Sequence, residues 1–155
     1  MTYGTATQNG LTSIHGRKLS TSKECNLTAQ SKRMTHPCID ATITVGDEAA
    51  NVRAITIQLT DANGDDVSEV TVIEAFVMSD ATGTAIATTG GSTGIAIGTD
   101  GAILTTITAK KHFVLSSESD GDIDLTWTDT GTESVALALK MPNGNMITTA
   151  AFANA

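Results

Sequence analysis

The stretch that decides the fold is Ala54-Ile55-Thr56-Ile57-Gln58-Leu59-Thr60. Its apolar side chains Ile55, Ile57 and Leu59 alternate with small or polar ones. An alternation with period 2 that uses β-branched residues is typical of a strand with one face in a core and one face in water. Residues 61–66 follow and contain Asn-Gly, a strong turn signal. This stretch therefore predicts a half-buried β-strand that ends in a turn.

Short runs of the same kind continue to the end of the chain, and turn signals separate them. Residues 70–77 are almost continuously apolar, which predicts a more central strand. No segment has apolar residues at helical spacing. We expect an all-β protein in which residues 40–155 form an immunoglobulin-like antiparallel β-sandwich. Its other strands are expected over residues 41–45, 85–87, 95–97, 103–108, 113–115, 123–128, 135–139 and 146–152.

Charge divides the chain into two regions of opposite sign. The 155 residues carry a net charge of −8. Residues 1–39 hold five basic side chains and one acidic side chain, for a net +4. Residues 40–155 hold four basic and 16 acidic side chains, for a net −12. The first region also lacks a sustained apolar pattern and cannot bury a core of its own. We therefore predict an extended basic N-terminal arm, residues 1–39, that orders on a partner.

Several classes of protein are disfavoured by composition. No apolar run has the length of a membrane span, and the first thirty residues contain no secretory signal pattern. Aromatic residues make up only 3% of an acidic chain, which argues against a nucleic-acid platform built on stacking. No nucleophile elbow, phosphate loop or metalloprotease motif occurs, and His112 is interpreted as a surface residue at a strand start. We expect no enzymatic activity and no cofactor.

Two groups of residues have the chemistry of metal ligands. Four carboxylates recur at every second position near Asp120-Gly121, where a bend would bring them together as oxygen ligands for calcium. The alternative is a set of solvated acids that keep a sheet edge soluble. Zinc ligands of suitable type occur near the N-terminus, but their spacing is poor. We expect two reduced thiols or a disulfide there, with both cysteines outside the sandwich. The carboxylates are Glu118, Asp120, Asp122 and Asp124, and the zinc candidates are His15, Cys25, His36 and Cys38.

A binding face for sugars or ice is a further hypothesis. Trp127 shares strand parity with Ile123 and Leu125, so we predict that it lies in the core and forms no sugar platform. Threonines on the polar parity of several strands could form an array, but they follow no fixed repeat, which favours ordinary strand surface. These threonines are Thr56, Thr60, Thr106, Thr108, Thr126 and Thr128.

Two parts of the chain resemble proteins of tailed bacteriophages. Residues 9–19, Asn-Gly-Leu-Thr-Ser-Ile-His-Gly-Arg-Lys-Leu, resemble the opening segment of a group of phage virion proteins. Ser20-Thr21 then stand where that group has Gly-Leu. In the acidic region, four turn-containing segments look like the immunoglobulin-like domain of phage head decoration or head-fibre proteins. These segments are residues 57–64, 97–101, 117–125 and 139–144.

The resemblance implies a non-enzymatic protein of the virion, located on the capsid surface and made in the host cytoplasm. Its implied partners are the major capsid protein and neighbouring copies in a dimer or trimer, with no nucleic acid and no membrane. A neck, tail or fibre component is the alternative within this class, and a carbohydrate- or host-surface-binding module lies outside it. The residues expected to anchor the arm on the capsid are Thr12, Ser13, His15, Gly16, Arg17, Lys18 and Leu19.

Overall fold

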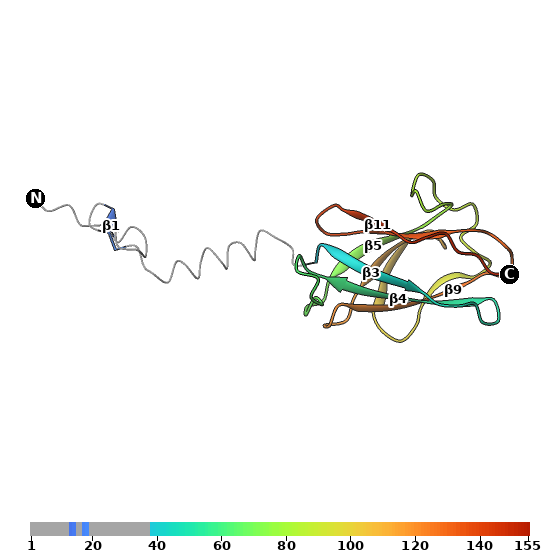
Figure 1. Cartoon of the computed structure of the whole chain (residues 1–155), viewed down its shortest axis with the longest axis horizontal. Coiled ribbons are helices and arrows are strands. Elements are labelled where there is room, and N and C mark those ends of the chain that lie inside the picture. The colour runs from blue at the N-terminus through green and yellow to red at the C-terminus, as the bar shows by residue number, and fades with distance from the viewer. Residues whose placement is uncertain (1–12, 15–16, 19–37) are drawn as a thin grey trace, which may run out of the picture. The chain divides into compact units, whose positions relative to one another are not determined.

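The computed structural model of the chain describes residues 13–14, 17–18 and 38–155. The chain separates into two compact units, Met1–His36 and Pro37–Ala155. The first unit contains a short antiparallel pair, β1 (Ser13–Ile14) and β2 (Arg17–Lys18). The regular structure of the second unit is entirely β (Figure 1). Among the residues that the structure describes, no helix could cross a membrane.

One sheet of the second unit has four antiparallel strands in the order β3-β4-β9-β6. Residues 54–60 form most of β4, and the alternation in their sequence is also an alternation of burial. Ile55, Ile57 and Leu59 are fully buried, whereas Ala54 and Thr56 are exposed. The strands of this sheet are β3 (Asp40–Val45), β4 (Val52–Thr60), β6 (Gly94–Ile97) and β9 (Asp122–Thr128).

The other sheet has five antiparallel strands in the order β11-β10-β5-β8-β7. The almost continuously apolar run became β5, which lies in the middle of this sheet as predicted. A turn at residues 142–145 joins β10 and β11, and there the Met141 N–H donates to the Asn145 carbonyl at 2.8 Å. The strands are β5 (Val72–Met78), β7 (Ala102–Thr108), β8 (His112–Ser116), β10 (Ala136–Lys140) and β11 (Met146–Thr148).

The two sheets pack as a β-sandwich, which confirms the predicted fold class. Strands β3, β4, β9 and β6 follow the A-B-E-D order of a constant-type immunoglobulin sheet, and β5, β10 and β11 follow C-F-G. The chain adds one feature to that plan. The hairpin of β7 and β8 is inserted between β6 and β9, and β8 extends the second sheet beyond β5.

Trp127 of β9 belongs to the core between the sheets. Its side chain is fully buried, as predicted from its parity. Its Nε1 donates a hydrogen bond to the Gly90 carbonyl at 3.3 Å, so the buried indole N–H has a partner. The ring meets Phe152 edge to face, with centroids 5.3 Å apart. An aromatic residue buried in this way presents no platform to a ligand.

Two expectations were wrong. Cys38 does not lie outside the sandwich, because its side chain is fully buried in the main core and the compact unit already begins at Pro37. Burial, reinforced by the charges of Asp40 and Glu69, raises the pKa of its thiol to about 11. Residues 85–87 form no strand, because only an isolated bridge between Met78 and Ile86 is present there. The segment contacts the end of β5 through only two backbone hydrogen bonds, from the Ser79 N–H to the Ala85 carbonyl and from the Ala87 N–H to the Val77 carbonyl.

Candidate functional site

The predicted anchoring motif lies partly within the described residues. Ser13 pairs with Lys18 and Ile14 pairs with Arg17 in the β1–β2 ladder. His15 and Gly16 stand between these strands in the sequence. Strand pairing in this segment was not predicted. The positions outside the described residues are Thr12, His15, Gly16 and Leu19, together with Cys25 and His36 of the zinc hypothesis.

The four predicted calcium ligands lie in one region. The Asp120-Gly121 bend is present, since the Gly121 N–H donates to the Glu118 carbonyl at 3.2 Å and Gly121 has a φ of +83°. Asp122 and Asp124 follow on the outer face of β9, where Asp124 accepts a hydrogen bond from the Thr56 hydroxyl at 3.0 Å.

Asp122 is partly buried next to Asp124 on the outer face of β9. Its pKa is raised by burial and then by the charge of Asp124, and its Oδ1 is buried without a hydrogen-bond partner. Even so, no three His, Cys, Asp or Glu side chains of the described residues are arranged to hold a metal ion. Calcium binding therefore stays a prediction from sequence, without support from the side-chain arrangement.

The threonine array divides between the two sheets. Thr56, Thr60, Thr126 and Thr128 lie on the outward parity of β4 and β9, whereas Thr106 belongs to β7 of the other sheet, as does Thr108. The six hydroxyl groups thus form no single surface.

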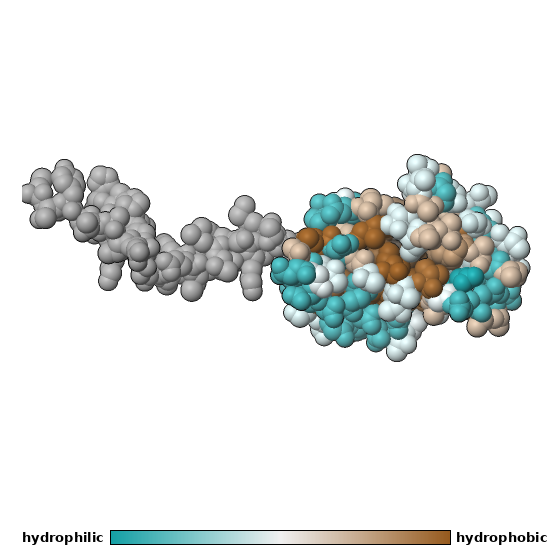
Figure 2. Space-filling view, in the orientation of Figure 1, coloured by the Kyte–Doolittle hydropathy of each residue, from teal (hydrophilic) through white to brown (hydrophobic). Residues whose placement is uncertain are grey.

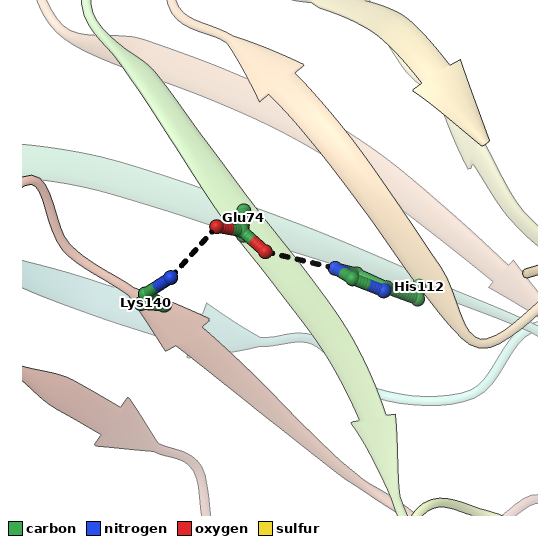
Figure 3. A network of polar contacts seen from close by, with 3 residues as sticks. All are labelled: Glu74, His112 and Lys140. Carbon is green, nitrogen blue, oxygen red and sulfur yellow. Dashed lines mark hydrogen bonds and ion pairs between the residues drawn. The ribbon is translucent and has the colours of Figure 1, made fainter. Parts of the chain in front are cut away.

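A polar network crosses three strands on the outer face of the five-stranded sheet (Figure 3). Glu74 of β5 lies between Lys140 of β10 and His112 of β8. Its Oε1 is 2.9 Å from Lys140 Nζ, and its Oε2 is 3.0 Å from His112 Nε2. Hydrogen bonds from Lys140 and then His112 lower the pKa of the Glu74 carboxyl. His112 also stacks on Phe76, with ring centroids 4.1 Å apart. The network ties neighbouring strands together.

A shallow hollow of about 420 Å³ opens beside this network. Its walls are mainly apolar, and Val72 on one wall keeps 49% of its surface exposed. Such a hollow could take an apolar side chain of another molecule, with Glu74 and Lys140 as polar contacts at its rim. The other apolar residues that line it are Ile73, Ile107, Val114, Met141 and Pro142.

A second polar cluster joins the connections between the sheets. The Glu133 carboxylate, just before β10, accepts hydrogen bonds from the backbone N–H groups of Thr89, Gly90 and Gly91 at 2.9, 2.9 and 3.2 Å. The Thr89 hydroxyl donates to it as well. Burial alone would raise the pKa of Glu133, but these hydrogen bonds together lower it to about 2. The carboxylate therefore links the β5–β6 connection to the β9–β10 connection. We call this set of hydrogen bonds the Glu133 latch.

Gly91 is required at this latch by two constraints. Its φ is +92°, a left-handed conformation that residues with a Cβ rarely adopt. A Cβ at this position would also lie 2.8 Å from the Thr128 carbonyl oxygen and 2.8 Å from Trp127 Nε1. The latch and the packing of the core tryptophan thus depend on the same glycine.

Sequence reasoning missed both polar clusters, for different reasons. Glu74 had a usable signal, because a lone carboxylate between Val72 and Phe76 on one strand parity calls for a cross-strand partner. Glu133 had none, since its partners are backbone N–H groups more than forty positions away.

Comparisons with known proteins add no relative. No family model, no curated protein and no solved structure matches the chain.

Proposed function

We propose that this protein is a non-enzymatic structural component of a phage virion that decorates the head. The N-terminal segment, residues 1–36, binds the capsid, and the sandwich is displayed outward. The observation that carries the proposal is the division of the chain at Pro37 into a basic segment with the phage-like motif and a compact acidic unit. A chain organised in this way suits an anchor joined to a displayed domain.

The charge distribution supports the two roles. The sandwich has four basic side chains, and those of Arg53, Lys110 and Lys111 donate to backbone carbonyls of the sandwich itself, while Lys140 pairs with Glu74. Its uncompensated charge is therefore negative and repels neighbouring sandwiches and packaged DNA. The guanidinium of Arg17, by contrast, has the planar geometry that pairs bidentately with a carboxylate on a partner.

Repetition makes weak anchors sufficient. A decoration protein binds many equivalent sites on one shell, and copies that associate with one another gain avidity from each anchor. A modest contact from about seven motif residues is then enough for stable decoration. This supports a role for residues 12–19 without a large interface on the sandwich.

The test is binding to purified heads that have been stripped of accessory proteins. We expect the full chain to saturate the heads and Arg17→Ala to bind at least about tenfold more weakly, since loss of a charge-assisted pair costs about 1.5–3 kcal/mol. Lys23→Ala is the matched control, because it removes one positive charge from the same segment outside the motif. A chain that starts at Pro37 should not bind.

The alternatives give different results in the same assay. Binding to tails and not to heads would support the neck, tail or fibre assignment and contradict decoration. Binding to host cells or glycans with no binding to virion parts would favour a host-surface module. Equal binding by the full chain and the Pro37 start would keep a capsid role but remove the anchoring mechanism.

A further inference from the structure

The four sheet edges of the sandwich are protected unequally. Exposed edges pair with foreign strands unless they are short, bulged, charged or covered. Strand β11 has three residues and β6 has four, so both are short. Strand β7 carries two register shifts. Strand β3, in contrast, has six residues that all pair regularly with β4, and it contains no Lys, no Pro and no bulge.

The free side of β3 presents backbone groups of alternate residues. Leu59 of β4 donates its N–H away from β3, to the Gly121 carbonyl at 3.0 Å. Leu59 and its register partner Ala41 therefore form a non-hydrogen-bonded pair. It follows that the backbone groups of Ala41, Ile43 and Val45 point to the free edge. The Ala41 N–H is already bonded to Asp40 Oδ1 at 2.9 Å. The N–H groups of Ile43 and Val45 are thus the donors open to an added strand.

Apolar side chains border the same edge. Ala41, Ile43 and Val45 of β3 and Ile147 of β11 are only partly buried against the core, and both strands are edges of their sheets. Figure 2 shows a band of hydrophobic residues on the face where Figure 1 places β3 and β11. A strand added to β3 would cover part of this band.

Charge decides which strand fits. Asp40 stands at one end of β3, and Asp47 and Glu48 follow its other end. If the β3 strands of two copies paired antiparallel, Asp40 of each copy would approach the Asp47–Glu48 end of the other, and like charges would oppose the pairing. A strand with basic residues near one end would instead place them beside the carboxylates at one end of β3.

We propose that the β3 edge accepts a strand from the N-terminal segment of a second copy of this chain, namely residues 27–34. This sequence, Leu-Thr-Ala-Gln-Ser-Lys-Arg-Met, alternates Leu27 and Ala29 with polar residues and includes Lys32 and Arg33. Residues 27–34 lie outside the described residues, and residues 35–37 join them to Cys38. A linker of three residues spans about 10 Å when extended, so the segment reaches the β3 edge of a copy in direct contact. The proposal stands whether or not the protein decorates a phage head.

Amide hydrogen exchange of the full chain tests this pairing directly. We expect the exchange of the Ile43 and Val45 amides to slow by at least about tenfold as the concentration rises, together with a shift in sedimentation from monomer to oligomer. Lys32→Glu should remove both effects. Lys23→Glu, the same reversal in the same segment but outside residues 27–34, should keep them.

Four results would overturn the proposal. The first is rapid exchange of both amides at every concentration. The second is protection of both amides that does not depend on concentration. Such protection would come from within one molecule and not from a second copy. The third is equal loss of protection in Lys32→Glu and Lys23→Glu, which would indicate general charge attraction without strand pairing. Protection that survives Lys32→Glu but remains concentration-dependent would assign the edge to another occupant, such as a second β3.

Discussion

The outer faces of the two sheets meet water in different ways. On the four-stranded sheet, Ala54 and Thr56 of β4 are exposed opposite a fully buried inner row. On the five-stranded sheet, Ala136 and Ala138 of β10 are fully buried although they face away from the main core. They form a second small cluster with Met78, against which Phe76 packs.

The difference shows that alternation predicts the inner face of a strand better than it predicts exposure of the outer face. From Ala54 to Thr60, β4 has large apolar side chains on one parity only, whereas β10 has leucines on one parity and alanines on the other. The small alanines let larger neighbours from β5 close over them. The five-stranded sheet therefore has a covered patch, a polar network and an apolar hollow on one face, while the other sheet has a Thr- and Asp-rich wet face.

An alanine-to-aspartate substitution on the outer face of each sheet should give the largest difference in the free energy of unfolding. Ala138→Asp buries a charge without a partner and should lower the free energy of unfolding by about 3 kcal/mol or more. Ala54→Asp is the matched control on the exposed face and should change it by less than about 0.5 kcal/mol. Urea unfolding of both variants measures the difference. Similar losses in both would mean that the outer face of β10 is not distinctively covered.

The latch at Glu133 should contribute less than the buried face, because it lies near the surface. Glu133→Gln keeps the shape but weakens the hydrogen bonds from Thr89, Gly90 and Gly91, and should cost about 1 kcal/mol at neutral pH after allowance for solvent screening.

The effect of Glu133 on stability should depend on pH with a definite sign. The folded state lowers its pKa from the ordinary value of 4.5 to about 2, so its contribution is complete above 4.5 and is lost as the pH falls toward 2. Thermal melts between pH 7 and pH 2 should therefore show the wild type and Glu133→Gln converging at low pH. A constant difference across this range would contradict the latch.

A stabilising substitution is expected in the turn between β3 and β4 of the four-stranded sheet. Ala50 has a φ of +53° in the turn closed by Ala49 and Val52, a conformation that penalises a Cβ. Ala50→Gly should raise the free energy of unfolding by about 0.5 kcal/mol, because relief of strain exceeds the entropy that glycine adds to the unfolded chain. A melting temperature equal to or below that of the wild type would show that this turn is unstrained.

The network on the five-stranded sheet should have the smallest effect. Glu74→Gln removes the ion pair with Lys140 and weakens the bond to His112, but both partners are partly exposed. We expect a loss of no more than about 0.5 kcal/mol at low salt and less at high salt. Chemical unfolding at two salt concentrations measures it, and a loss that grows with salt would be inconsistent with an ion pair.

The sequence predicted the sandwich well because its strands carry their own signals. The Ile55–Ile57–Leu59 parity, the central position of β5 and the burial of Trp127 all follow from local alternation. The prediction of a strand at residues 85–87 was wrong, because an alternation of three residues is too short to distinguish a strand from an isolated bridge. The prediction that Cys38 lies outside the sandwich was wrong, because burial just before β3 depends on the opposite sheet, which no local pattern encodes.

The candidate sites could be predicted less well. The Asp120-Gly121 bend was found from its turn signal, yet the directions of the four carboxylates depend on cross-strand neighbours such as Thr56. The Glu133 latch depends on backbone groups that are remote in sequence. The anchoring motif lies largely outside the described residues, so its role rests on its resemblance and its charge.

The most direct test of the anchor-and-display account is electron cryo-microscopy of stripped heads saturated with the full chain. The account predicts density for residues 1–36, including the Arg17 region, against the shell, with the acidic sandwich projecting outward. It would be contradicted by a map in which the sandwich lies flat on the shell and its N-terminal segment makes no contact with it.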